Sequence, residues 1–139
     1  MTQDTFDAIC EWEFIERSGK TVTVRMGRPI FDPKTEGWGC ESEIVGLAQG
    51  TKYRARGTDP FQAVIMAMER FRVIFEQEEG SYTSPPGGSS PYFVFPRYIP
   101  TVYGTDVHER ITKLVEREIQ KVEDEWTRRW EESQRKRNK

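Results

Sequence analysis

Alternation of apolar and charged side chains near the start constrains the fold of this chain more than any other feature. In residues 6–15 the apolar positions are Cys10, Trp12 and Phe14, and Glu11 and Glu13 lie between them. A period of two is typical of a strand with one side in water. The same alternation returns in residues 21–26 after a polar turn, so the two segments are predicted to form a hairpin.

Two more strands are predicted between residues 38 and 56. Their inward positions are Trp38, Cys40, Ile44, Tyr53 and Ala55. Their outward positions place Glu41 and Glu43 opposite Lys52, Arg54 and Arg56, and opposite charges across strands stabilise a sheet. The intervening residues 27–37 contain Pro29, Pro33 and Gly37, and they are interpreted as a loop. Gln49 and Gly50 are expected to join the last two strands.

A helix follows the strands. Asp59 is a suitable N-cap, Pro60 fits the first turn and Gln62 can complete a capping box. Gly80 is expected to end the helix. The stripe expected to face the sheet is Phe61, Val64, Ile65, Met68, Phe71, Arg72 and Phe75.

A second, longer helix is predicted from Asp106, with Glu109 completing a capping box, to about Gln134. Its apolar line is Ile111, Val115, Ile119, Val122, Trp126 and Trp130, widened by Leu114. The predicted fold class is therefore α+β: a four-stranded antiparallel meander packed by one helix, plus a long C-terminal amphipathic helix. The divisions are residues 1–80, a loop over 81–104 and the helix of 105–139, all in one domain.

The order of these signals resembles an uncharacterised family of small bacterial β-sheet-plus-helix proteins of unknown function. The matching residues are 23–29, Trp38, Cys40, Ile44, Gly46, Leu47, Gly57, Asp59, Gln62, Ala63, Phe95, Pro96, Arg97, Ile99 and Pro100. The resemblance spans residues 6–120 and implies no established activity and no catalytic residues. By size and bacterial setting, the family is similar to immunity proteins that neutralise a cognate toxin.

Composition limits the classes of function. The net charge of −2 argues against nonspecific nucleic-acid binding by the whole chain. One histidine, His108, and two cysteines that form no Cys-x-x-Cys motif predict no metal site, no cofactor and no catalytic residues. We expect a cytoplasmic protein without a membrane span, in which Cys10 and Cys40 are free thiols serving as small core residues.

Two segments remain as candidate binding surfaces. Residues 81–91 resemble a flexible spacer, and residues 92–103 concentrate aromatic side chains. The predicted partner-binding residues are Tyr92, Phe93, Phe95, Arg97, Tyr98, Tyr103, Trp126 and Trp130. Two alternatives stay open: the aromatic segment seals the core, and the long helix packs fully on its own domain.

The sequence therefore predicts a non-catalytic module that binds another protein, as an immunity- or antitoxin-like partner that sterically blocks a bacterial toxin. A homodimer through the C-terminal helix is a further expectation. One alternative is a nucleic-acid module that uses Lys52, Arg54, Arg56 and the basic tail. Another is an enzyme acting on a small ligand in a pocket without a sequence signature.

Overall fold

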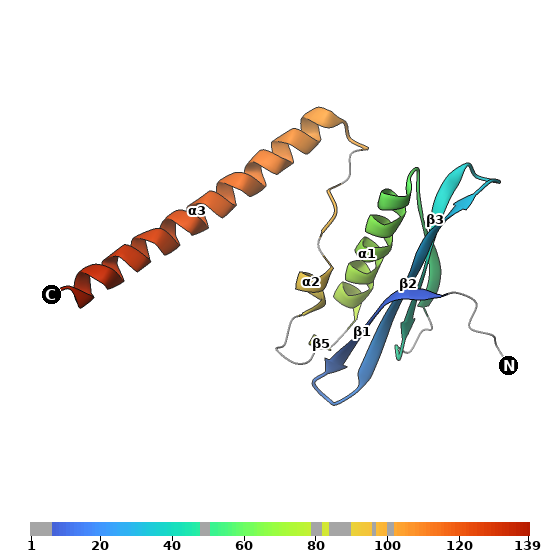
Figure 1. Ribbon diagram of the computed structural model, residues 1–139, viewed down its shortest axis with the longest axis horizontal. Helices are drawn as coiled ribbons and strands as arrows, with labels where there is room; N and C mark the ends of the chain where they lie inside the picture. Colours follow the sequence, from blue (N-terminus) through green and yellow to red (C-terminus); the bar gives the residue numbers. More distant parts are fainter. Residues whose placement is uncertain (1–6, 48–50, 79–81, 84–89, 96, 100–101) are drawn as a thin grey trace. The chain divides into compact units, whose positions relative to one another are not determined.

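The computed structural model describes residues 7–47, 51–78, 82–83, 90–95, 97–99 and 102–139, with only the backbone of residues 51, 92 and 93. The chain divides into two compact units, residues 1–98 and residues 99–139. The first contains a sheet and two helices, and the second contains one long helix (Figure 1). The α+β class predicted from the sequence is confirmed.

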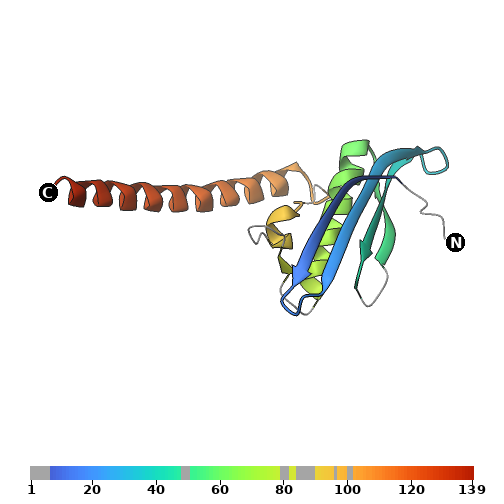
Figure 2. The same ribbon diagram turned by 60° about the horizontal axis from the view of Figure 1, so that its bottom comes forward.

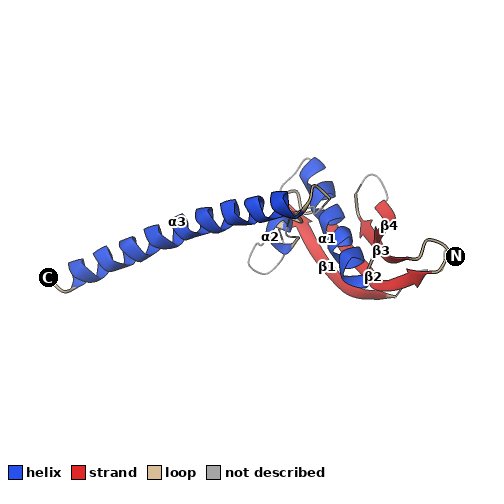
Figure 3. Cartoon of the chain, turned by 90° about the horizontal axis from the view of Figure 1, so that it is seen from above, coloured by secondary structure: helices blue, strands red, loops and turns tan. Residues whose placement is uncertain are grey.

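The sheet has five antiparallel strands in the order β4-β3-β2-β1-β5. They are β1 (Ala8–Glu16), β2 (Thr21–Asp32), β3 (Gly37–Val45), β4 (Thr51–Gly57) and β5 (Tyr82–Thr83). The first four form the predicted meander. Seen from above, these strands curve around α1 (Pro60–Gln77), which lies on the concave side (Figure 3).

The prediction of a loop over residues 27–37 is wrong. β2 continues to Asp32 and β3 begins at Gly37, so only residues 33–36 form the turn. A register irregularity between Met26 and Pro29 lets β2 carry both a glycine and a proline without losing its partner strand. The Cys40 thiol then donates a hydrogen bond to the Gly27 carbonyl at 3.3 Å.

The predicted N-cap of α1, Asp59, is confirmed, but the Gln62 side chain bonds one residue before the position that a capping box requires. The Asp59 carboxylate accepts a hydrogen bond from the Gln62 backbone N–H at 2.8 Å, and the Gln62 side chain accepts one from the Thr58 N–H at 2.6 Å. The helix ends at Gln77 with Glu78 as its C-cap, and Gly80, the expected end, lies outside the described residues.

The face of α1 that meets the sheet differs in part from the predicted stripe. Its buried residues are Ala63, Ala67, Phe71, Arg72, Ile74 and Phe75. Phe61 is 80% exposed, and Ile65 is also exposed. The reason lies at Gly57, where an added Cβ would meet the Ala63 nitrogen at 2.4 Å. Because strand and helix approach so closely, small alanines rather than Phe61 face the sheet.

A short helix, α2 (Pro91–Val94), follows β5. Directly after it, Phe95 enters the core, where its ring lies 5.1 Å from that of Phe71 and 5.8 Å from that of Phe14. Phe14 and Phe75 are 5.2 Å apart, so rings from β1, α1 and the residue after α2 form one cluster. This unit therefore closes its core with an aromatic residue from beyond the meander.

The second unit contains α3 (Thr105–Arg137), a continuous helix of 33 residues (Figure 2). Its N-cap is Gly104, which offers no side chain, so the capping box predicted at Asp106 and Glu109 is wrong. Asp106 instead lies in the first turn, while Arg135, Lys136 and Arg137 lie in the last. These positions place charges of favourable sign at both ends of the helix dipole.

Candidate functional site

The outer face of the sheet carries ion pairs between neighbouring strands. The Arg25 guanidinium lies 3.1 Å from the Glu11 carboxylate and 3.2 Å from that of Glu43, and it thus joins β1, β2 and β3. Arg54 meets Glu41 at 2.6 Å, in agreement with the expectation that these acidic and basic side chains oppose each other across the two strands. Lys52 lies opposite Glu43 in the same register. Arg56 pairs instead with Asp32 at 3.8 Å.

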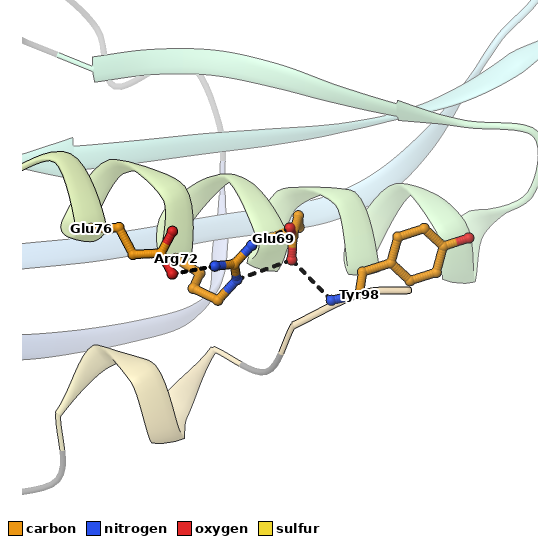
Figure 4. A network of polar contacts seen from close by, with 4 residues as sticks. All are labelled: Glu69, Arg72, Glu76 and Tyr98. Atoms are coloured by element: carbon orange, nitrogen blue, oxygen red, sulfur yellow. Dashed lines mark hydrogen bonds and ion pairs between the residues drawn. The ribbon is translucent and has the colours of Figure 1, made fainter. Parts of the chain in front are cut away.

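A polar network attaches the segment after α2 to helix α1 (Figure 4). Arg72 is buried, with 4% of its surface exposed, and it forms ion pairs with Glu69 and Glu76 one turn away on either side. The Tyr98 backbone N–H donates to the same Glu69 carboxylate at 2.9 Å. The sequence analysis placed Arg72 in the apolar stripe of this helix. The two carboxylates balance its charge, so that the guanidinium can be buried at this position.

The network favours the ionised form of the Glu69 carboxyl. Hydrogen bonding from Arg72 holds the pKa of the Glu69 carboxyl below its ordinary value, and the Tyr98 N–H and the Arg97 charge act in the same direction. Partial burial opposes this lowering. The carboxylate therefore serves as an ionised anchor for residues 97–98.

The two cysteines have different surroundings. Both are free thiols, as expected, but only Cys40 is buried. Burial raises the pKa of the Cys40 thiol. Cys10 is exposed, so the expectation that it is a core residue is wrong. It lies on the inner face of β1, at the part of the sheet that α1 leaves open.

An apolar cavity of about 510 Å³ opens beside Cys10. Its walls come from β1, β2, α1 and the end of α2, and they include Trp12, Val24, Met26, Met68, Phe71 and Phe95. Trp12 is half exposed although it lies on the inner face. The sequence alternation placed Cys10 and Trp12 on the same apolar face as Phe14, but it contained no signal that this face would stay uncovered here.

The apolar line of α3 lies along one side of the helix, and α3 is the only element described in its unit. The exposed residues of this line are Leu114, Val115, Ile119, Val122, Trp126 and Trp130. Ion pairs within the helix join Lys121 to Glu118 at 2.7 Å and Arg129 to Glu125 at 2.5 Å. These pairs support the helix locally while no described element of its own unit covers the apolar line.

The predicted partner-binding residues are divided between the two units. In the first unit, Phe95 is buried, Arg97 is exposed and Tyr98 is half-buried beside α1. In the second, Tyr103 is exposed and Trp126 and Trp130 lie one turn apart on α3. Tyr92 and Phe93 belong to α2, but their side chains lie outside the described residues, as do residues 84–89 of the predicted spacer.

A family model described as "Domain of unknown function (DUF6968)" matches residues 12–81, half of the chain. The chain belongs to the DUF6968 family. The DUF6968 match begins within β1, covers β2, β3, β4 and α1, and ends just before β5. Comparison with curated proteins gives no match, and comparison with solved structures gives none either.

The DUF6968 segment contains most of the sheet and the Glu69–Arg72–Glu76 network, while α2 and α3 lie outside it. Within the described ranges, no helix is long and apolar enough to cross a membrane. The described part of the chain also brings together no group of three or more histidine, cysteine, aspartate or glutamate residues able to hold a metal ion.

Proposed function

We propose that this DUF6968 protein is a non-catalytic protein-binding module whose principal contact surface is the apolar line of α3. The observation that carries the proposal is the pair Trp126 and Trp130, 65% and 64% exposed on a helix that is the only element described in its unit. Full burial of an aliphatic or aromatic side chain contributes about 1.5–3 kcal/mol, so a protein that covers this line gains substantial free energy. Tryptophan is also enriched among the residues that dominate binding energy at interfaces.

The distribution of charge along α3 indicates the polarity and charge of the surface that would bind it. At 100° per residue, Glu116 and Glu123 border the apolar line on one side, and Glu118 and Glu125 border it on the other. Most of the basic residues before Trp126 lie on the opposite face. The best match is an apolar groove with a basic rim, into which α3 inserts as an amphipathic helix. Two copies of α3 would bring these acidic borders together, which disfavours the homodimer.

We further propose that the partner is a toxin and that this chain acts as an immunity- or antitoxin-like protein by occupying the toxin's working surface. Support comes from the family resemblance described above. A long apolar line on α3 is also compatible with steric blockage, because covering a working surface requires only contact area. On this proposal the chain needs no reacting group of its own.

The test is capture from a lysate of the source organism by three full-length forms of the chain. The forms are the wild type, a Trp126→Ala/Trp130→Ala variant and a control, Arg117→Ala/Arg128→Ala, altered on the opposite face. One protein should be retained in stoichiometric amount by the wild type and the control, and lost from the tryptophan variant. Retention should persist at about 1 M salt, where surface charges are screened within about 3 Å.

The captured protein is then produced in cells alone and together with each form. Growth arrest by the captured protein, relieved by the wild type and the control but not by the tryptophan variant, is the expected result. Equal capture by all three forms would exclude the α3 surface. Self-association of the chain, measured by light scattering, would indicate that the apolar line of α3 is a homodimer interface. Nucleic acid that is captured and then released by salt would favour the alternative in which the basic residues bind nucleic acid.

A further inference from the structure

One edge of β1 has, along part of its length, no partner strand among the residues that the structure describes. The Glu16 N–H donates to the Lys20 carbonyl at 2.8 Å, so the backbone groups of Glu16 face β2. Because these groups point alternately to the two sides of an antiparallel strand, those of Glu11 and Glu13 face away from β2. Ile15 follows the same rule, since it pairs with Thr83 of β5 on that outer side.

β5 covers only the last two residues of this edge, Ile15 and Glu16. Among the residues that the structure describes, none pairs with Glu11 or Glu13 on the outer side. In the sequence, Pro85 and Pro86 come soon after β5, and proline has no N–H with which to extend a ladder. The backbone groups of Glu11 and Glu13, which no described residue pairs on this side, therefore form a template for an added strand.

The apolar cavity lies directly beside this open edge. Trp12 and Cys10 alternate with Glu13 and Glu11 along β1 and line the cavity, together with Met68 and Phe71 of α1. A strand added along the edge would place every second side chain on the same inner face. Those side chains would meet a space of about 510 Å³ that is almost entirely apolar.

The outer face beside the same edge is acidic. Glu11 shares Arg25 with Glu43, and no described residue forms an ion pair with Glu13. Opposite charges directly across two strands stabilise the pair, and like charges destabilise it. A second copy of β1 would bring Glu11 and Glu13 against their own equivalents, so this edge does not suit self-pairing. It suits an incoming strand with lysine or arginine at these positions.

We propose that the open edge of β1 binds an extended segment of another protein by strand addition, with apolar residues entering the cavity and basic residues alternating with them opposite Glu11 and Glu13. Main-chain hydrogen bonds would supply part of the affinity, and the cavity and the two carboxylates would supply the selectivity. This surface belongs to the first unit and does not depend on the tryptophans of α3.

Amide exchange of the full-length, isotopically labelled chain tests the proposal directly. The probe is the peptide acetyl-Thr-Lys-Phe-Lys-Val-Lys-Thr-amide, which has the required alternation. Saturating peptide should slow exchange at the Glu11 and Glu13 amides by at least about tenfold, since they gain partners. Exchange at Cys10 and Trp12, whose amides already face β2, should change little.

Two methylated peptides distinguish strand addition from simple apolar binding. Methylation of the lysine backbone nitrogens that face β1 should abolish binding, whereas methylation at phenylalanine and valine, whose nitrogens face away, should preserve it. Equal binding by both methylated peptides would overturn the proposal. The same conclusion follows if the unmodified peptide, at about 1 mM, leaves the Glu11 and Glu13 amides unprotected.

A charge reversal in the protein tests the basic preference. Glu13→Lys should weaken peptide binding about three- to tenfold, because an attractive cross-strand pair becomes repulsive. The control Glu36→Lys makes the same change in the turn between β2 and β3 and should leave affinity unaltered. Equal weakening in both variants, or tighter binding of a peptide with glutamate in place of lysine, would overturn the selectivity that we assign to this edge. The Trp126→Ala/Trp130→Ala variant should bind the peptide normally.

Discussion

Glu69 is a single residue on which the attachment of the segment after α2 depends. It receives hydrogen bonds from the Arg72 side chain and from the Tyr98 N–H, and these lower the pKa of its carboxyl from the ordinary value of 4.5. A lowered pKa in the folded state means that the stabilising contribution is complete above pH 4.5 and is lost as pH falls through the lowered pKa.

Glu69→Gln should therefore flatten the fall in stability as the pH drops from 4.5 through the lowered pKa of this carboxyl. The measurement is the free energy of unfolding in urea across this range for the variant and the wild type. Glu36→Gln, which removes a carboxylate from an exposed turn, is the control. An equal flattening in the control would show that general charge, and not the network, governs the acid sensitivity.

Gly57 permits the close approach of β4 and α1. A Cβ at this position would meet the Ala63 nitrogen at 2.4 Å and the Gln62 carbonyl carbon at 2.8 Å, both backbone atoms that cannot turn aside. Gly57→Ala should lower the free energy of unfolding by about 1–3 kcal/mol. In the control Gly39→Ala, the nearest atom is Arg54 Cδ at 2.8 Å, at the end of a flexible side chain, so chemical denaturation should show a smaller loss.

At the scale of elements, Phe95 is the residue that fixes α2 against the sheet and α1. Its ring contacts those of Phe14, Phe71 and Phe75. Phe95→Ala should lower the free energy of unfolding by about 3–5 kcal/mol, since it removes a buried ring from a packed cluster. Phe61→Ala, at an exposed position of α1, should change it by less than about 0.5 kcal/mol. Similar losses in thermal or urea unfolding would contradict this role for Phe95.

Elements with a regular pattern could be predicted, and elements that depend on distant contacts could not. Alternation located the strands, and Asp59 with Gln62 located the start of α1. The extension of β2 through Pro29 depends on a bulge, and the two-residue strand β5 depends on Tyr82 packing against Phe75, with ring centroids 5.2 Å apart. Neither feature has a local signal, because both are set by residues far away in the sequence.

At the scale of the whole molecule, Cys40 reports on global unfolding and Cys10 does not. Cys40 lies fully buried in β3, with β4 on one side of it and β2, β1 and β5 on the other, whereas Cys10 is exposed. A thiol reagent in excess should label Cys10 at once and Cys40 at least about a thousandfold more slowly, since Cys40 becomes accessible only when the sheet opens. Mass spectrometry of the labelled chain gives both rates, and comparable rates would contradict the burial of Cys40.

The two candidate binding surfaces differ in how far the sequence could predict them. The apolar line of α3 follows from its helical spacing alone, so Trp126 and Trp130 could be named in advance. The open edge beside Glu11 and Glu13 could not be named, because it exists only where β5 is short and α1 leaves Trp12 uncovered. A strand's free edge is a property of the assembled sheet and has no pattern within the strand itself.

The position of Cys10 allows covalent labelling of this protein at the wall of the apolar cavity. Its thiol stands on the wall of the 510 Å³ cavity, while Cys40 is shielded in the core. Small disulfide-bearing fragments would consequently be captured at one site only, without any engineered residue. Ranking them by resistance to a mild reductant would map which apolar shapes the cavity accepts and would supply lead compounds against whatever segment binds there.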